Sequence, residues 1–308
     1  MRASVVLCTR DRENRLSRAL EALAAMQVPP NVEWECLIVD NASRDATRAT
    51  VDAFIRDDHP KFRYTYESEP GKTFALNRGI AEARGEILAF TDDDAIVAPN
   101  WLEAILDAFE RYGADGVGGK VLPIWQAQRP DWLDDECFNV LALLDLGDEP
   151  FRIDWKKVRM LYGVNYAFHK RVFATVGNFN TVLGSRGEDQ ELFDRLALVD
   201  ARVFYDSAII VRHIIPGDRL TKRYYVEWYR ASGAARAKLE PAGRLKVLGI
   251  PTYTMRQGLF VLAQFVTAAI MCDRRRMLRY WFRIQFFSSY YLGRMKTVRF
   301  RSEDARAR

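Results

Sequence analysis

An apolar run over residues 87–90 ends at Thr91 and is followed at once by three aspartates, residues 92–94. A short apolar run bounded by polar residues predicts a buried strand. In an open α/β sheet, ligands bind beyond the carboxyl ends of the strands. Adjacent carboxylates raise one another's pKa unless a cation lies among them, and hard oxygen ligands suit Mg²⁺ or Mn²⁺. The stretch therefore predicts either a metal-dependent site or a solvated acidic turn that caps a helix beginning near Pro99.

Three further apolar runs precede this one, with helical periodicity between them. The predicted strands are residues 4–8, 34–39, 62–67 and 87–90, and the predicted helices are residues 12–26, 46–55 and 73–84. Strands that alternate with helices of this length predict a parallel sheet with right-handed crossovers. Each strand ends in polar residues on the same edge. Four such ends describe a nucleotide pocket better than four unrelated helix caps do.

The second half of the chain has a less regular pattern. We expect helices over residues 101–112, 171–176 and 187–198, strands over residues 116–121, 203–205 and 209–211, and a loop-rich insertion over residues 124–158. From residue 221 onward the chain reads as mostly helical, basic and aromatic.

Charge divides the chain into two parts. Residues 216–308 contain 20 Lys and Arg against 6 Asp and Glu, whereas residues 1–215 contain 26 against 35, within an overall net charge of +5. An acidic body with a basic tail indicates a boundary near Pro216. We therefore expect an α/β domain over residues 1–215 and a basic helical extension over residues 216–308.

The cysteines and apolar runs favour a cytoplasmic protein. The four cysteines form no CxxC pair, and Cys8 and Cys36 lie in predicted strands, where reduced thiols are typical. We expect no signal peptide, because residues 1–3 lead directly into a strand. The longest apolar stretch, residues 258–272, is shorter than the roughly 20 residues that a membrane-spanning helix needs.

A set of short motifs occurs in a specific order along the chain. The motifs are residues 4–10 (SVVLCTR), 39–43 (VDNAS), 71–79 (GKTFALNRG), 91–94 (TDDD), 163–165 (GVN), 187–191 (GEDQE) and His213. In this order and spacing they resemble the inverting family 2 glycosyltransferases, over about residues 3–236. The resemblance implies a GT-A fold, a Rossmann-like mixed sheet with a nucleotide-binding half (1–119) and an acceptor half (120–215). Residues 118–233 look like the subgroup that makes bacterial surface polysaccharides or exopolysaccharides.

The resemblance implies a nucleotide-sugar donor, here a UDP-sugar. The residues expected to bind the nucleotide are Cys8, Thr9, Arg10, Asp40, Lys72 and Asp92. Asp40 would accept a hydrogen bond from uracil N3, although an Asx turn between strand and helix is the alternative. Asp92 would contact the ribose. Lys72 begins a predicted helix, where a cation and exposed N–H groups suit an anion, although an ordinary solvated lysine is the alternative.

One departure from the family pattern concerns the phosphate contact. Many members have Ala-Arg-Asn where this chain has Ala75, Leu76 and Asn77. Lys72 or Arg78 would then supply the missing cation.

The resemblance also implies a metal, Mn²⁺ or Mg²⁺, held by Asp94. His213 would be a further contact to the metal or the diphosphate, although a lone histidine after a strand is often structural. Because side chains alternate along an extended segment, Asp92 and Asp94 are expected to share one side. Asp93 is then expected to point away and to tolerate Asn.

The acceptor side is expected to carry one general base, because inverting transfer needs a single base opposite the leaving group. Asp189 fits the base position of the family, Glu188 would orient the acceptor, and Asn165 would hold the donor sugar. The alternative is that Glu188 and Asp189 are first-turn acids that favour the helix dipole.

The acceptor implied by the resemblance is a hydroxyl of a glycan, including a lipid-linked one. In residues 216–308, basic and aromatic residues interleave beside the apolar run, which fits a helix on an anionic membrane surface at the inner face of the cell membrane. A homodimer interface and a helical cap over the site are alternatives. Nucleic acid is disfavoured, because no recognised reader motif accompanies the charge.

Two other functions remain open at this point. A sugar nucleotidylyltransferase would need a glycine-rich phosphate loop after the first strand, and residues 8–12 contain no glycine. A catalytically inactive nucleotide-sugar-binding scaffold subunit would not need the complete set of Asp92, Asp94 and Asp189.

Overall fold

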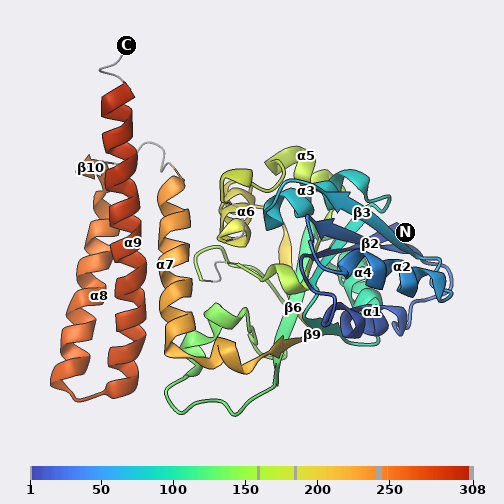
Figure 1. Cartoon of the computed structure of the whole chain (residues 1–308), viewed down its shortest axis with the longest axis horizontal. Helices are drawn as coiled ribbons and strands as arrows, with labels where there is room; N and C mark the ends of the chain where they lie inside the picture. The colour runs from blue at the N-terminus through green and yellow to red at the C-terminus, as the bar shows by residue number, and fades with distance from the viewer. Residues whose placement is uncertain (1, 158–159, 184–185, 240–244, 248, 305–308) are drawn as a thin grey trace. The chain divides into compact units, whose positions relative to one another are not determined.

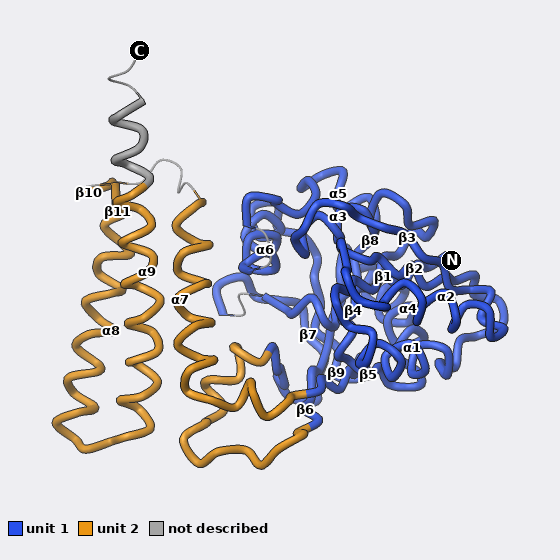
Figure 2. Tube along the Cα trace, viewed as in Figure 1, with its two compact units in different colours: residues 1–124, 142–214 blue, residues 125–141, 215–308 orange. Residues whose placement is uncertain are grey.

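The computed structural model describes residues 2–157, 160–183, 186–239, 245–247 and 249–304, the last eight of these by their backbone. The chain forms two compact units (Figure 2). The sheet unit contains residues 1–124 and 142–214, and the helical unit contains residues 125–141 and 215–308. Each is described separately below.

The sheet unit is built on one mixed sheet (Figure 1). Its strand order is β3 (Phe62–Glu67), β2 (Glu33–Asn41), β1 (Arg2–Thr9), β4 (Ile87–Asp92), β8 (Tyr166–His169), β6 (Gly116–Trp125), β9 (Val203–Ile215) and β5 (Ala95–Val97), and β7 (Phe151–Arg152) also pairs with β9. The first four of these strands are parallel. Strand β8 is antiparallel to both β4 and β6, and β5 is antiparallel to β9. The expected α/β fold with a mixed sheet is confirmed.

The register of β1 brings the polar strand ends together. Thr9 lies opposite Asp40 of β2, and Cys8 lies opposite Asp92 of β4. The carboxyl ends of three neighbouring strands therefore form one edge, which is where parallel sheets place their ligands.

The helices of the sheet unit are close to the predicted ones. They are α1 (Leu16–Ala24), α2 (Thr47–Arg56), α3 (Lys72–Glu82), α4 (Trp101–Tyr112), α5 (Lys170–Val176) and α6 (Glu188–Leu198). Strand β1 is buried along almost its whole length, so elements cover both faces of the sheet. Helix α3 packs on β1 at Gly79, where an added Cβ would lie 2.4 Å from Val6 Cγ1. This close approach fixes the start of α3 relative to the strand ends.

Two expectations for the second half differ from the structure. Residues 203–205 and 209–211 belong to one strand, β9, because the polar residues between them find partners: Tyr112 donates to Asp206 and Ser207 donates to the Asp148 carbonyl. Residues 125–141, which we placed in the first domain, group with the helical unit, since Trp132 packs edge-on against Tyr225 at 5.1 Å.

The helical unit consists mainly of three helices. They are α7 (Lys222–Lys238), α8 (Thr252–Ile270) and α9 (Arg274–Asp304), with a small hairpin of β10 (Lys246–Val247) and β11 (Ile250–Pro251). Helix α9 packs against both α7 and α8. The approach to α7 is close at Gly233, where an added Cβ would lie 2.2 Å from the Phe286 carbonyl oxygen. In the parts of the chain that the structure describes, no helix is both long and apolar enough to cross a membrane.

Asn165 lies in the core of the sheet unit and not on an acceptor-facing surface, which differs from the expectation that it holds a sugar. Its side chain is completely buried. The amide oxygen accepts from Trp101 Nε1 at 2.8 Å, and the amide nitrogen donates to the carbonyl oxygens of Lys120 at 2.8 Å and Ile209 at 3.0 Å. These bonds use both N–H donors and one lone pair of the amide oxygen, and they join α4, β6 and β9, so Asn165 has a structural role in the core.

We expect Asn165→Asp to destabilise the fold strongly. The substitution preserves shape but turns a carboxylate oxygen toward the two carbonyls, which leaves that oxygen without a donor and a buried charge with Trp101 Nε1 as its donor, and costs about 3 kcal/mol or more of unfolding free energy. Urea unfolding measures the loss. Asn178→Asp, at an exposed position, is the matched control and should change stability little. Equal stability of the two variants would contradict the core assignment.

Candidate functional site

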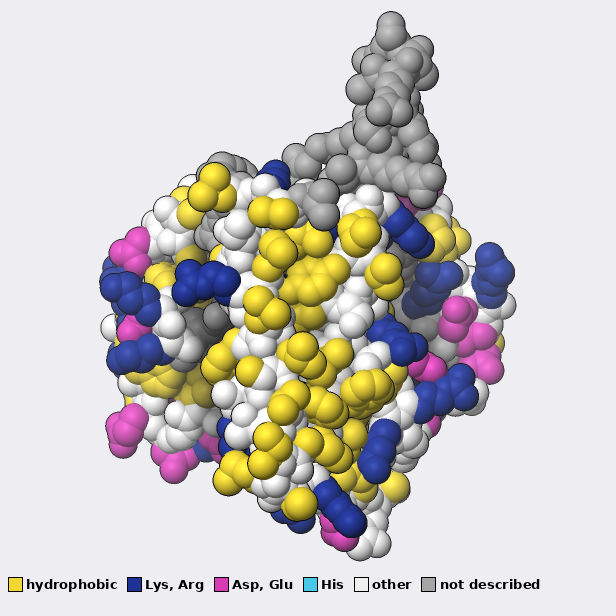
Figure 3. Space-filling view, turned by 90° about the vertical axis from the view of Figure 1, so that its left-hand side faces the viewer, with side chains coloured by type: hydrophobic (Ala, Val, Ile, Leu, Met, Phe, Trp, Pro, Cys, Tyr) yellow, Lys and Arg dark blue, Asp and Glu magenta, His cyan; other side chains and the backbone are white. Residues whose placement is uncertain are grey.

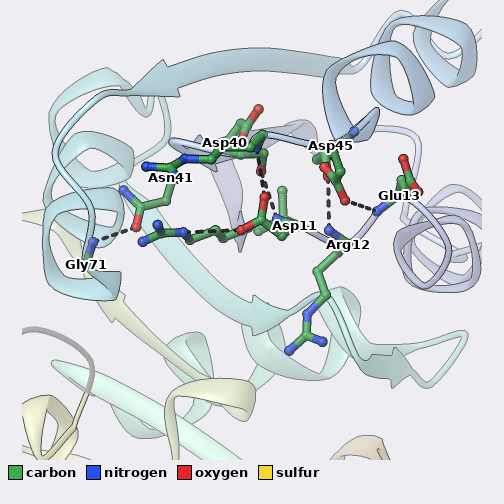
Figure 4. Close-up of polar contacts among 12 residues, drawn as sticks. Asp11, Arg12, Glu13, Asp40, Asn41, Asp45 and Gly71 are labelled. Carbon is green, nitrogen blue, oxygen red and sulfur yellow. Dashed lines mark hydrogen bonds and ion pairs between the residues drawn. The ribbon is translucent and has the colours of Figure 1, made fainter.

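Hydrogen bonds join the loops that follow β1 and β2 and precede α3 (Figure 4). Asp11 N donates to Ser43 Oγ at 2.9 Å, and Arg44 N donates back to Asp11 Oδ1 at 2.8 Å. On the other side, Gly71 N donates to Asn41 Oδ1 at 2.7 Å. The three loops therefore form one continuous rim at the carboxyl ends of the strands.

Two residues in this rim have left-handed backbone conformations. Asp11 has φ 53° and Ala42 has φ 56°. Aspartate tolerates this region, but alanine rarely adopts it, and such strain costs roughly 1–3 kcal/mol per residue. Strained residues that the surrounding hydrogen bonds hold in place are typical of ligand sites. The rim is therefore a candidate for nucleotide contact.

Asp40 is buried at the base of the rim. Tyr64 donates its hydroxyl to Asp40 Oδ2 at 2.8 Å, and Ser43 N donates to Oδ1 at 3.1 Å. Burial and the Asp40 carboxylate raise the pKa of Tyr64 to about 12, so its hydroxyl remains a donor. The Ser43 contact is the turn considered above as the alternative to ligand binding. Each carboxylate oxygen has a second lone pair, so these bonds leave acceptor capacity for a ligand N–H.

The three aspartates after Phe90 do not alternate as an extended strand would. Asp92 is the last residue of β4, but Asp93 and Asp94 lie in a tight turn before β5. Asp93 is buried, accepts the Thr9 hydroxyl at 2.7 Å and lies 3.6 Å from Arg12 Nε. Burial and the neighbouring Asp94 raise the pKa of Asp93 to about 7. Asp93 therefore points to protein partners, Thr9 and Arg12. The strand alternation from which we expected it to point away ends at Asp92, and its tolerance of Asn stays a prediction.

Asp94 faces His213 across the pair β5 and β9. The Nε2 atom of His213 lies 3.0 Å from Asp94 Oδ1, and both side chains are buried. Ala95, the next residue, pairs with His213 in the strand register, which explains the contact. The two groups come together although 119 residues separate them in sequence.

This pair is the candidate for a divalent cation. Among the residues described, no group of three or more His, Cys, Asp or Glu is arranged to hold a metal. Mg²⁺-type sites commonly use one or two carboxylates and take their other ligands from phosphates and water. Asp94 and His213 fit a cation of this kind if a diphosphate supplies the remaining oxygens.

Lys72, the first residue of α3, is an internal cation and not a solvated lysine. Its Nζ lies 2.9 Å from Asp92 Oδ1 and 3.9 Å from Glu188 Oε1. Burial by itself would lower the pKa of Lys72, but Asp92, Glu188 and Asp189 together raise it well above its ordinary value. Lys72 therefore stays charged and links the end of β4 to the start of α6.

Asp189 lies in the first turn of α6 with both carboxylate oxygens held. Gly163 N donates to Oδ2 at 3.0 Å, from the 3₁₀ turn Gly163–Asn165, and the Tyr166 hydroxyl donates to Oδ1 at 2.8 Å. Burial raises the pKa of Asp189, while Lys72 and the two hydrogen bonds lower it. Burial and Asp189 raise the pKa of Glu188 to about 7. The two acids thus share a dry, cation-linked pocket suited to proton transfer.

Tyr166 is the site residue that sequence reasoning missed. It follows the Gly163–Asn165 motif in a run that reads as apolar, and its side chain is completely buried. A buried tyrosine hydroxyl usually has a hydrogen-bond partner, which is the one available signal, but the sequence does not identify that partner.

The remaining predicted residues lie at the end of β1. Cys8 is partly buried, and burial raises the pKa of its thiol, so it is a neutral group. Arg10 is exposed, with Nε 3.6 Å from Asp11 Oδ2. Arg78, the alternative cation, pairs with Glu82 at 2.7 Å on α3. Lys72, and not Arg78, therefore contacts the acidic residues of the site.

We expect Glu188→Gln to change the pH dependence of stability. Because the pKa of Glu188 is raised in the folded state, the folded protein binds more protons than the unfolded chain, and stability falls as pH rises toward 7. As pH rises from the ordinary pKa of a glutamate toward 7, the free energy of unfolding of the variant should increase relative to that of the unmodified protein by at most about 1.4 kcal/mol per pH unit. Urea unfolding from about pH 5 to about pH 8 measures this.

The exposed Glu110 on α4 provides the control variant, Glu110→Gln, which should track the unmodified protein. If the stability of Glu188→Gln and that of the unmodified protein depended on pH in the same way, the raised pKa of Glu188 would be contradicted.

Comparison with known proteins gives a family match. The model of glycosyl transferase family 2 matches residues 4–177. Glucosyl-dolichyl phosphate glucuronosyltransferase of Haloferax volcanii is 29% identical over 191 residues, which are 61% of this chain and 59% of that protein. Succinoglycan biosynthesis protein ExoM of Rhizobium meliloti is 25% identical over 234 residues, which are 74% of this chain and 72% of that protein. The aligned region thus spans less than two thirds of the Haloferax protein.

Solved structures agree on the fold. The mannosyltransferase PcManGT from Pyrobaculum calidifontis, in complex with GDP-Man and Mn²⁺, has a TM-score of 0.63 at 18% identity, covering 95% of this chain and 86% of that one. S. aureus TarS 1–349, in complex with UDP-GlcNAc, has a TM-score of 0.55 at 16% identity and covers 97% and 92%. The expected family and fold are confirmed: the chain belongs to glycosyl transferase family 2 and has the GT-A fold.

Proposed function

We propose that the protein transfers a sugar, with inversion, from a UDP-sugar to a hydroxyl of a glycan or lipid-linked acceptor. The observation that carries the proposal is the environment of Asp189, whose two oxygens are held by Gly163 N and the Tyr166 hydroxyl. Such a carboxylate is fixed in orientation and largely dry. Asp189 acts electrostatically on Lys72, which pairs with Asp92. Asp92 is the last residue of β4, on the edge where we place the nucleotide.

The nucleotide would bind at the rim. Asp40 has acceptor capacity for the uracil N3–H, and Asp92, at the end of β4 on the other side of β1, would contact the ribose. Cys8 and the exposed Arg10 border the same edge. Thr9 acts indirectly in this proposal, because its hydroxyl is already donated to Asp93. Lys72 is the cation nearest to where the diphosphate would lie.

Asp94 and His213 would hold the divalent cation. When bound, Mn²⁺ or Mg²⁺ supplies positive charge that stabilises the departing diphosphate. The Mn²⁺ in the PcManGT complex supports this part of the proposal.

Asp189 would act as the general base in a single displacement. The acceptor hydroxyl oxygen forms a bond to the anomeric carbon on the face opposite the diphosphate, and its proton passes to Asp189. The bond from the anomeric carbon to the diphosphate oxygen breaks, and its electron pair leaves with the nucleoside diphosphate. Glu188 would orient the acceptor. A raised pKa makes Asp189 a stronger base once it is ionised.

We expect UDP with Mn²⁺ to raise the melting temperature. A ligand at 100 times its Kd stabilises the folded state by about 2.7 kcal/mol. Differential scanning fluorimetry with UDP, with Mn²⁺ and with both measures the shift. Asp94→Asn should lose the additional shift that Mn²⁺ gives, whereas Asp107→Asn, at an exposed position on α4, should retain it. No shift with UDP and Mn²⁺ at saturating concentration would reject the donor assignment.

Asp189→Asn should abolish transfer while UDP still binds. Loss of a general base lowers the rate by roughly 10²–10⁴-fold, because the acceptor hydroxyl then keeps its proton as the bond forms. Initial rates with a panel of UDP-sugars, together with the UDP-dependent melting shift, measure the two effects separately. Asp194→Asn, at an exposed position about one and a half turns further along α6, is the control.

Tyr166→Phe provides a graded version of the same experiment. Removing one hydrogen bond to the ionised carboxylate raises the pKa of Asp189, so the acid limb of the pH–rate profile should move to higher pH. Transfer at wild-type level by Asp189→Asn, with an unmoved acid limb in Tyr166→Phe, would place the base elsewhere.

A further inference from the structure

Helix α8 exposes an unusual number of large apolar side chains. Leu259 is 67% exposed and Ile270 is 78% exposed. The other large apolar residues exposed on α8 or directly after it are Met255, Phe260, Leu262, Val266 and Met271. Figure 3 shows hydrophobic side chains gathered in a band on this side of the helical unit, with Lys and Arg, and some Asp and Glu, along its flanks. We call these seven residues the α8 face.

The α8 face follows helical spacing and is therefore continuous. Met255, Leu259, Leu262, Val266 and Ile270 recur every three or four residues, which places them on one side of a helix. At 1.5 Å per residue, α8 is about 28 Å long. An apolar surface of this extent rarely faces water in a monomer, because its burial elsewhere would be favourable. The face needs an apolar partner along its length.

The charges around the α8 face are positive. Arg256 is exposed on α8 itself, and Arg274 and Arg275 are exposed at the turn into α9. The acid at this turn, Asp273, is engaged as the cap of α9, where its carboxylate accepts from Arg276 N at 3.0 Å. Anionic groups are therefore the complementary partners at the edges of the face.

Trp281 of α9 adds a residue type that suits an interface between apolar and polar regions. It is 44% exposed and packs against Phe265 of α8, with ring centroids 6.3 Å apart. Tryptophan has a large apolar ring and one N–H, so it is favoured where one side is apolar and the other is hydrated.

We propose that the α8 face binds the surface of an anionic lipid bilayer, with α8 lying in the plane of the interface. An amphipathic helix of this kind buries its apolar side at the boundary between headgroups and acyl chains, and arginines at its edges attract anionic lipids. A second copy of the chain is a poorer occupant. In a two-fold dimer the same patch meets itself, which would bring the same arginines together without opposing charge. This inference does not depend on the sugar chemistry proposed above.

Flotation of the full-length protein with lipid vesicles tests the apolar part of the proposal. The unmodified protein should float with vesicles that contain phosphatidylglycerol and much less with pure phosphatidylcholine vesicles. The double variant Leu259→Glu/Ile270→Glu should lose at least about tenfold in partitioning, because two carboxylates would enter the interface. Leu198→Glu, at a leucine 86% exposed on α6, is the matched control and should float normally.

The electrostatic part has its own variant pair. Arg274→Ala/Arg275→Ala should weaken binding to anionic vesicles roughly 30-fold at low salt and reduce its salt dependence. Lys222→Ala/Arg223→Ala, also exposed basic residues of the helical unit, should have a smaller effect. Melting temperatures of all variants establish that they fold.

Two outcomes would overturn the membrane proposal. One is that the unmodified protein stays at the bottom of the gradient with anionic vesicles at low salt. The other is that sedimentation shows a dimer which Leu259→Glu/Ile270→Glu dissociates, since the α8 face would then be occupied by a second copy. Either result leaves the UDP-dependent melting shift unaffected, so it is separable from failure of the proposed transferase function.

Discussion

The ion pair of Lys72 with Asp92 is the interaction on which the candidate site depends. Three carboxylates act on Lys72: Asp92 and Glu188 lie within 4 Å and Asp189 contributes through space. Without a cation these acids would repel one another, because they lie close together and are at most partly exposed. Lys72 therefore allows the acidic end of β4 and the acidic start of α6, which we propose bind the nucleotide and carry the base, to exist side by side.

The position of Lys72 follows from the backbone around it. It is the first residue of α3, and Gly71 immediately before it has φ 146°, a conformation open to glycine. Asn41 holds the Gly71 N–H, and Gly79 lets the helix approach Val6 of β1. The lysine is thus fixed by two glycines and one amide, none of which contacts the carboxylates.

Local patterns predicted most of the sheet unit, because they are properties of short segments. Apolar runs gave β1 to β4 and helical periodicity gave α1 to α4, with ends that differ by a few residues. Asp189 and Asp94 were also indicated, since their motifs are local. What the local patterns could not indicate was that Asp189 meets Tyr166. Asp94 and His213 were paired in advance only through the family resemblance, and the structure brings them within 3.0 Å although 119 residues separate them.

The errors have the same origin. Asn165 was expected to hold the donor sugar because it belongs to a motif of the family, but tertiary packing surrounds it with Trp101 and two carbonyls. Asp93 was expected to point away from Asp92 and Asp94 because strand alternation was applied across a turn. In both cases the side chain's contacts come from residues distant in the sequence, which a motif or a strand pattern does not reveal.

The aspartate triplet gains a clearer meaning from these contacts. The three adjacent carboxylates contact three different partners: Asp92 contacts Lys72, Asp93 contacts Thr9 and Asp94 contacts His213. Of these partners, Lys72 is shared with other acids and Thr9 is neutral, and Arg12 at 3.6 Å from Asp93 offsets one further charge, so the triplet with Glu188 and Asp189 keeps an excess of negative charge. That excess explains why Asp93 is easily protonated, with its pKa raised to about 7 by burial and Asp94. We infer that the same excess would attract a divalent cation to Asp94, because a cation there would relieve the repulsion that the protein's own groups leave uncompensated.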